Sequence, residues 1–472
     1  LHLLSRRQRQ MCIRDSCLLC LPSLGMLFFK TDVSVEQRQV QIFPSIKTGG
    51  KLNVKFFDQL NDYFSDNFAF RQNLIEVDAI IKKNVFRQSG NEKVIVGSKG
   101  YLFFSETLDD YLGQNTLSKR EIYSCGRVLS LLQENVEHNN RQFLFVIAPN
   151  KNSLYPEYMP KRYIKTSEQN NYSLLQAEMK KENINTVDLK KMFIDSGKEV
   201  YHKLDSHWNN QGAAMGCNAI LNYLGKDHYD YTNERHTIKK NFSGDLYGML
   251  FPKGNKKDTN VIYNKKSSYK VTSNNKKVTD ISIETESKGK KESIVMYRDS
   301  FGNALIPFVA DEFHNGYFTK AVPYNWNLQN EKKADKVVIE LVERHIHSLI
   351  EEAPYMAAPL RAGNLNTMEV NSNTTAEIGD DEEYVPISGK VDSKYIDDDS
   401  KIYVRLKSED NEYTYEAFPA PIDVTSKNEG YDYGMYLDTS QVEAGTYDID
   451  VITQKDNKYY SSGVKTSLEL EE

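Results

Sequence analysis

The stretch SIVMYRDSFGNAL, residues 293–305, decides the fold class. Its first part, SIVMY (293–297), is a short apolar run of the kind that forms a buried strand. Ser300 follows at a predicted sharp turn, and a helix is expected to begin directly behind it. Strands that alternate with helices in this way are typical of a parallel sheet flanked by helices. The stretch therefore predicts an α/β protein.

The segments on both sides repeat the alternation. Further buried strands are predicted at FLFVIAP (143–149), NTVDL (185–189) and KVVIEL (336–341). Helices are predicted over about 118–138 and 167–182, and another begins near Asn209. Ser118 opens the first of these helices, and Glu121, three residues later, completes a capping box. These elements together predict one sheet built from distant parts of the chain.

Beyond residue 360 the pattern changes to short alternating segments separated by polar turns, such as IYVRL and YDIDVI. This pattern is typical of an antiparallel β-sandwich. A Lys-rich stretch at 253–291, with few apolar residues, is predicted to be a solvated insertion of hairpins and loops. The predicted organisation is a leader with a signal or anchor (1–46), a helical lead (47–92), an α/β catalytic domain (93–355), a linker (356–383) and a β-sandwich domain (384–472).

The leader contains the only strong apolar run, CLLCLPSLGMLFF (17–29). It is shorter than the roughly 20 residues that a membrane-spanning helix needs. Arginines at 6, 7, 9 and 14 precede it, so it is typical of the core of a signal peptide or of a shortened signal anchor. We therefore expect an exported, extracytoplasmic protein, with an N-terminal tether to the membrane as the alternative to cleavage. Residues 1–16 are unlike a normal leader and are left out of the fold prediction.

The composition excludes several functional classes. With 39% apolar and 27% charged residues, the chain has the composition of a soluble globular protein. The net charge of −6 gives no support for nucleic-acid binding. No C-x-x-C pair lies within the body of the chain, so no zinc site is predicted, and Cys125 and Cys217 are expected to be buried. No other metal or cofactor is predicted.

Two short stretches contain the residues that could carry chemistry. One is KLDSHW (203–208), and the other is RDSFG (298–302). A serine hydroxyl becomes a nucleophile only when a base takes its proton, and a carboxylate must hold that base in one tautomer. Ser300, His207 and Asp205 supply these three groups. Taken singly, the serine could be a helix N-cap and the Asp-x-His pair a surface loop, but both stretches are expected at strand ends, where α/β sheets bind ligands.

At these residues the sequence resembles a known family, the DHHW branch of the SGNH-hydrolase-like superfamily, which includes the alginate O-acetylation proteins of the bacterial periplasm. The resemblance covers about residues 51–350. It rests on seven blocks in order: DYFSDNFAFRQNLI (62–75), VGSKGYLFF (96–104), IAPNKNSLYPEYMP (147–160), LDSHW (204–208), FSGDLYGML (242–250), RDSFGNAL (298–305) and ADKVVIELVER (334–344). The family name implies two adjacent histidines, and Ser206 replaces the first of them here.

The resemblance implies an SGNH-hydrolase-like, flavodoxin-like sheet in which the Asp–His block precedes the serine block. It places Arg344 and Asn325 in the loops that would contact the oxyanion or the substrate. An ion pair between Arg344 and Glu340 or Glu343 is the structural alternative. Three further candidates for oxyanion or substrate contact are Lys151, Tyr155 and Arg298, and a structural role is the alternative for the first two.

The function that the resemblance implies is O-acetyl transfer to an extracytoplasmic polysaccharide through an acetyl-Ser300 intermediate. The implied acetyl donor is a membrane-bound O-acyltransferase partner, and no cofactor is required. The same three residues would serve a carbohydrate acetyl esterase equally well, because only the acceptor changes from a sugar hydroxyl to water. A catalytically silent polysaccharide-binding scaffold is the third alternative.

Overall fold

The computed structural model describes residues 41–48, 51–82, 89–232, 234–363, 365–381, 383–423, 428–464 and 466–470, and scattered positions between 16 and 29. The leader at 1–16 thus lies, apart from its last residue, outside the described residues, and so do residues 17–19, 22 and 27 of the apolar run. Among the described helices, none combines the length and the apolar character that crossing a membrane requires.

The centre of the molecule is a mixed sheet, for which the described residues give seven strands. In spatial order these are β6 (Thr186–Val187), β5 (Gln142–Ala148), β13 (Lys336–Val342), β11 (Ser293–Tyr297), β12 (Asn315–Thr319), β10 (Ser282–Glu286) and β9 (Lys270–Val271). The first five run parallel, as the alternation of strands and helices predicted. Their side chains are largely buried on both faces, which explains their continuous apolar sequences.

The last two strands on one side of the sheet, β10 and the edge strand β9, differ from the predicted parallel sheet, because each runs antiparallel to its neighbours. Both come from the Lys-rich stretch, which was expected to be a solvated insertion of hairpins and loops. Strand β10 can join the sheet because its residues alternate: Ile283 and Thr285 are buried while the residues between them are partly exposed. The insertion therefore extends the central sheet.

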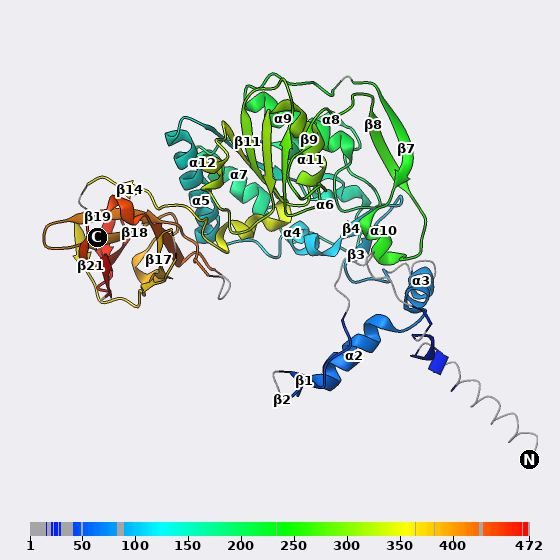
Figure 1. Cartoon of the computed structure of the whole chain (residues 1–472), viewed down its shortest axis with the longest axis horizontal. Helices are drawn as coiled ribbons and strands as arrows, with labels where there is room; N and C mark the ends of the chain where they lie inside the picture. Colours follow the sequence, from blue (N-terminus) through cyan, green and yellow to red (C-terminus); the bar gives the residue numbers. More distant parts are fainter. Residues whose placement is uncertain are drawn as a thin grey trace, which may run out of the picture.

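Helices cover both faces of the sheet (Figure 1). One face packs against α5 (Lys119–His138), α7 (Asn171–Lys181) and the 3-10 helix η6 (Glu343–Ile350). The other packs against α8 (Leu189–Ser196), α9 (Asn210–Tyr223) and α11 (Gly302–Val309). The capping box of Ser118 and Glu121 is confirmed at the start of α5. Cys125 and Cys217 are buried on opposite faces as free thiols, as expected.

Around this core lie shorter elements and the N-terminal lead. They are β1 (Lys47–Thr48), β2 (Lys51–Leu52), α2 (Phe56–Asn67), α3 (Arg71–Ile81), β3 (Val94–Val96), β4 (Leu102–Phe104), α4 (Leu108–Leu112), α6 (Lys151–Leu154), β7 (His236–Phe242), α10 (Asp245–Leu250), β8 (Asp258–Tyr263) and α12 (Leu328–Glu331). The helical spacing predicted at 51–88 is thus divided between α2 and α3. Phe70 separates them with a φ of 65°, a left-handed conformation that an α-helix cannot contain.

The C-terminal region is rich in antiparallel strands. One sheet contains β14 (Leu360–Arg361), β15 (Thr367–Glu369), β18 (Ile402–Lys407), β19 (Glu412–Ala417), β21 (Gly445–Lys455), β22 (Lys458–Ser461) and β23 (Thr466–Leu470), and the other contains β16 (Glu377–Ile378), β17 (Val385–Lys390) and β20 (Asp432–Leu437). Side chains of both sheets share one apolar cluster, as in a sandwich. Strands β14, β15 and β16 lie within or beside the stretch expected as a linker.

The C-terminal region lies against the helix-covered α/β body (Figure 1). Phe418, Ala420 and Tyr436 join the apolar cluster beneath α5. Arg127 of α5 donates from Nε to Oε1 of the buried Glu416 at 2.6 Å. Arg120, also buried, donates to the backbone carbonyls of Ser400 (2.5 Å) and Gly430 (2.8 Å). Apolar packing and buried cations together fix this contact.

Candidate active site

The turn after β11 presents Ser300 at the carboxyl end of the parallel strands. Asp299 holds this turn, because its Oδ1 accepts the N–H of Phe301 (2.7 Å) and its Oδ2 accepts the N–H of Val342 at the end of β13 (2.8 Å). Gly302 then begins α11. The Ser300 side chain is left partly exposed at the point where two neighbouring strands end.

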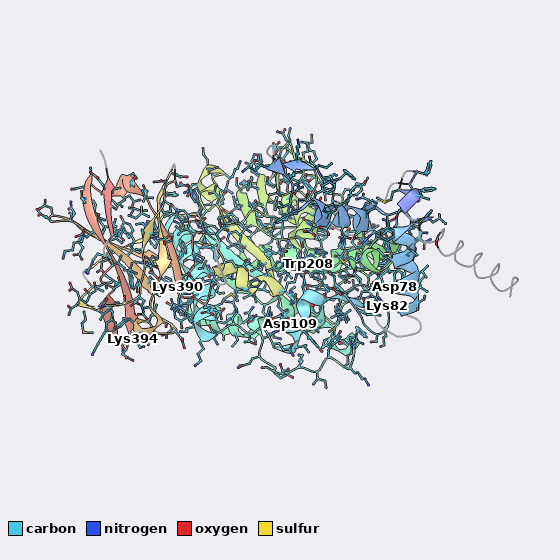
Figure 2. All side chains as sticks on the ribbon, turned by 90° about the horizontal axis from the view of Figure 1, so that it is seen from below. Asp78, Lys82, Asp109, Trp208, Lys390 and Lys394 are labelled. Carbon is cyan, nitrogen blue, oxygen red and sulfur yellow. The ribbon has the colours of Figure 1, made fainter. Side chains whose placement is uncertain are left out.

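The segment that carries His207 is a loop that precedes α9, as predicted. Tyr201 and Trp208 form a β-bridge that closes the loop, and Asn209 caps the helix through its side chain. Trp208 is 1% exposed, and its indole N–H donates to the backbone carbonyl of Phe301 at 3.0 Å. Figure 2 shows this tryptophan within the body of the molecule. One hydrogen bond thus ties the histidine loop to the serine turn.

Ser300, His207 and Asp205 form a continuous chain of hydrogen bonds. Nε2 of His207 lies 2.8 Å from Oγ of Ser300, and Nδ1 of His207 lies 2.8 Å from Oδ1 of Asp205. The same Oδ1 accepts the backbone N–H of His207 at 2.9 Å. The structure thus brings together the three residues that the sequence selected, with the imidazole between hydroxyl and carboxylate as base catalysis requires.

The charges in this chain stabilise one another. Burial alone would raise the pKa of Asp205, but the hydrogen bond to His207 and the backbone N–H donors hold it below its usual range. Burial would likewise lower the pKa of His207, but Asp205 and the nearby carboxylate of Asp245 raise it above its usual value. The site therefore favours an ionised Asp205 and stabilises a protonated His207.

Lys151 stands behind the Asp–His loop and is 4% exposed. Its ammonium donates to three backbone carbonyls, those of Leu102 (2.7 Å), Lys203 (2.9 Å) and Asp205 (2.9 Å). Burial lowers its pKa to about 7, against the opposing effect of nearby carboxylates. These contacts support the structural alternative for Lys151, in which it joins strand β4 to the loop that carries Asp205 and His207.

Replacing Lys151 by methionine should lower the free energy of unfolding by about 2 kcal/mol, because three buried carbonyls lose a donor. The Asp205 loop should also lose its fixed position, so the hydrolysis of an activated acetyl ester should fall. Urea unfolding and ester hydrolysis measure the two effects. Lys203→Met, which alters a lysine side chain with 39% exposure in the same loop, is the control. Equal behaviour of the two variants would contradict the role given to Lys151.

Two other candidates also make structural contacts. The hydroxyl of Tyr155 accepts the backbone N–H of Val200 at 2.9 Å. Arg298 is 4% exposed, and its guanidinium donates to Asn303 Oδ1 (2.6 Å) and to backbone carbonyls of the Lys-rich insertion, those of Val278 and Asp280. Arg298 therefore joins the insertion to the serine turn.

Arg344 and Asn325, the two oxyanion candidates, differ in their surroundings. The guanidinium carbon of Arg344 lies 5.6 Å from the ring centre of Phe301, the residue after Ser300, and its Nε has no hydrogen-bond partner among the described residues. No ion pair of Arg344 with Glu340 or Glu343 is present among these residues. Asn325 Oδ1 instead accepts the N–H of Asn327 within its own turn. Arg344 thus has a donor without a partner among the described residues, beside the residue that follows Ser300.

The sequence did not single out Asp245, whose carboxylate completes a group of three ligand-type side chains with Asp205 and His207, all within 4.8 Å. Such a group could in principle hold a metal ion, but Nδ1 of His207 already faces Asp205 Oδ1 in hydrogen-bond geometry. Asp245 lies in FSGDLYGML (242–250), one of the seven blocks that resemble the family. A charged residue within such a block was the signal that could have identified it.

Comparison with known families confirms the resemblance seen in the sequence. Residues 94–279 match the family described as "SGNH hydrolase-like domain, acetyltransferase AlgX". This range contains Asp205, His207 and Asp245, and it ends before Ser300. No curated protein matches the sequence.

Several solved structures match part of this one at low sequence identity. A DHHW family protein from Eubacterium siraeum has 15% sequence identity and a TM-score of 0.40, and the match covers 54% of this chain and 94% of that one. PatB1 of Bacillus cereus has 15% identity and a TM-score of 0.42, with 54% and 96% covered. AlgX of Pseudomonas aeruginosa has 14% identity and a TM-score of 0.36, with 77% and 90% covered.

Proposed function

We propose that this protein transfers acetyl groups through Ser300. The proposal is supported by the match of residues 94–279 to the SGNH hydrolase-like acetyltransferase family. The observation that carries the proposal is the hydrogen-bonded chain from Ser300 Oγ through His207 to Asp205. The acceptor that we propose is a hydroxyl of a cell-surface or secreted polysaccharide, since the match is to acetyltransferases of the AlgX type.

In the first step, Oγ of Ser300 attacks the acetyl carbonyl while Nε2 of His207 takes the hydroxyl proton. Asp205 accepts Nδ1–H of the imidazolium and holds the ring in place. The backbone N–H of Ser300 donates no hydrogen bond to any described residue, and together with Arg344 it can stabilise the oxyanion. The imidazolium then protonates the leaving group, which leaves an acetyl ester on Ser300.

In the second step, His207 removes a proton from the acceptor hydroxyl, which attacks the acetyl-Ser300 ester. Protonation of Ser300 Oγ by the imidazolium then restores the enzyme. Water in place of the sugar would make the protein an acetyl esterase. The side chain of His207 is 27% exposed, so the geometry leaves access for either acceptor. We further propose that a membrane-bound partner supplies the acetyl group. The apolar run at 17–29 would direct export of the protein.

The acceptor can be identified by incubating the protein with an activated acetyl ester and a panel of surface oligosaccharides. We expect an oligosaccharide to gain the mass of one acetyl group, and the Ser300→Ala variant to give none. The same panel in acetylated form, incubated without donor, tests the alternative. If no oligosaccharide gains acetyl while acetylated ones lose theirs rapidly, the protein is an esterase. If neither reaction occurs, the non-catalytic scaffold replaces both.

A further inference from the structure

A second carboxylate faces the imidazole of His207. Asp245 is the first residue of α10, and its side chain is 10% exposed. Its Oδ2 lies 3.6 Å from Nδ1 of His207, the nitrogen that also faces Asp205. Its backbone N–H donates to Oδ2 of Asp205 at 2.8 Å. Asp245 therefore contacts both the base and the residue that orients the base.

Ser206 fixes the position of this carboxylate. The backbone N–H of Ser206 donates to Oδ1 of Asp245 at 2.7 Å, and its hydroxyl donates to Oδ2 at 2.5 Å. The same hydroxyl lies 3.1 Å from Nδ1 of His207. Because Ser206 takes up the nearer Asp245 oxygen, Asp205 remains the direct acceptor for Nδ1–H, while the charge of Asp245 stays close to the ring.

We propose that Asp245 is a positioning residue for His207, a second negative charge that stabilises the imidazolium formed during acyl transfer. The inference rests on the proposed function. When the Ser300 proton moves to Nε2, the ring becomes a cation and its Nδ1–H remains bonded to Asp205 Oδ1. A negative charge 3.6 Å from Nδ1 lowers the energy of that cation more than the energy of the neutral ring. Asp245 thus acts on the charged state more than on the resting state.

Other charges also face this pair. Arg344 opposes the carboxylates by lowering the pKa of His207, and Lys151 lies close enough to Asp245 and Asp205 for both to raise its own pKa. Burial, followed by repulsion from Asp205, raises the pKa of Asp245 to about 6. Asp245 is therefore charged above about pH 6, and it is already charged at the higher pH at which His207, with its raised pKa, becomes neutral and can act as a base.

Asp245→Asn tests the charge while preserving the shape. The amide oxygen can still accept the N–H of Ser206, whereas the amide nitrogen cannot accept the Ser206 hydroxyl, so the variant loses the negative charge and this one acceptor. Because that charge raises the pKa of His207, its loss should lower this pKa by about one unit. The acid limb of the rate profile should move to lower pH by the same amount, since neutral His207 then forms at lower pH. The plateau rate should fall about tenfold, because the imidazolium is less stable.

Two measurements on the full-length protein keep the inference separate from the proposed function. Titration of the His207 imidazole by NMR needs no activity, whereas hydrolysis of an activated acetyl ester against pH does. Asp245→Glu restores the charge and should recover part of the shift in the pKa of His207. Asp258→Asn is the matched control, since Asp258 holds the same loop by accepting the N–H of Leu204 at 2.7 Å. It should leave the pKa of His207 unchanged.

An unchanged titration of His207 in Asp245→Asn would overturn the inference. An equal shift in Asp258→Asn would also overturn it, because the effect would then come from loop packing. If the wild-type protein hydrolyses no ester and acetylates no acceptor, the proposed function fails, and the NMR titration still decides whether Asp245 sets the charge state of His207.

Discussion

Replacing Ser300 by alanine should reduce the hydrolysis of an activated acetyl ester by about 10⁶-fold. The variant lacks the oxygen that forms the acyl-enzyme, and no neighbouring hydroxyl takes its place at 2.8 Å from Nε2 of His207 among the described residues. The fold should be preserved, because the turn is held by Asp299 and its backbone donors rather than by the Ser300 side chain. Initial rates of ester hydrolysis measure the loss of activity, and thermal unfolding tests whether the fold is preserved.

Ser348→Ala is a suitable control for this variant. It removes a partly buried hydroxyl that donates to the His345 carbonyl at 2.7 Å in η6, outside the hydrogen-bonded chain. Its rate should equal that of the wild-type protein. A Ser300→Ala variant that still turned over the ester at the wild-type rate would exclude Ser300 as the nucleophile.

Asp205→Asn should reduce the rate by about 10⁴-fold while leaving the volume of the side chain unchanged. At present Oδ1 of Asp205 accepts both the backbone N–H and the Nδ1–H of His207. An amide group there can donate to Nδ1, which places the ring proton on Nε2, opposite Ser300 Oγ. The imidazole would then be unable to take the serine proton. Ester hydrolysis gives the rate, and the imidazole ¹⁵N shifts report which nitrogen carries the proton.

A rate within tenfold of the wild type would show that Asp205 is not needed to orient His207. If the rate falls but the tautomer is unchanged, the loss comes from the missing charge alone. Asp205→Asn should also lower the pKa of His207, because the hydrogen bond to the carboxylate is what raises it against the effect of burial.

The parallel part of the fold could be predicted because its signals are local. The apolar run at 293–297 and Ser118 with Glu121 each fall within a few residues, so the sequence contains the complete pattern. Strand β10 was missed because Ile283 and Thr285 alternate with polar residues in a Lys-rich stretch, and only pairing with β12 buries them. Long-range pairing of this kind leaves little trace in local composition.

The same distinction applies to the site. Asp205 and His207 lie two residues apart, and the strand–turn–helix pattern singled out Ser300. Asp245 lies near His207 only because α10 packs beside the loop. Its position in the sequence therefore did not reveal that the two side chains are close in space. Asn325 was assigned from its place in a loop, and its Oδ1 accepts a hydrogen bond within the local turn. A residue such as Asp245, whose contacts depend on the docking of separate elements, was therefore missed.

The bond between Trp208 and the Phe301 carbonyl bears on how the protein acquires activity during folding. The two residues are 93 positions apart, as are His207 and Ser300. Neither the histidine loop nor the serine turn can therefore form the site alone. Closing so long a loop costs conformational entropy before its contacts form, which places this step late in folding. A partly folded chain with native secondary structure would thus lack the paired hydroxyl and imidazole. The proposed acyl transfer would therefore be detectable only after the α/β core has folded completely.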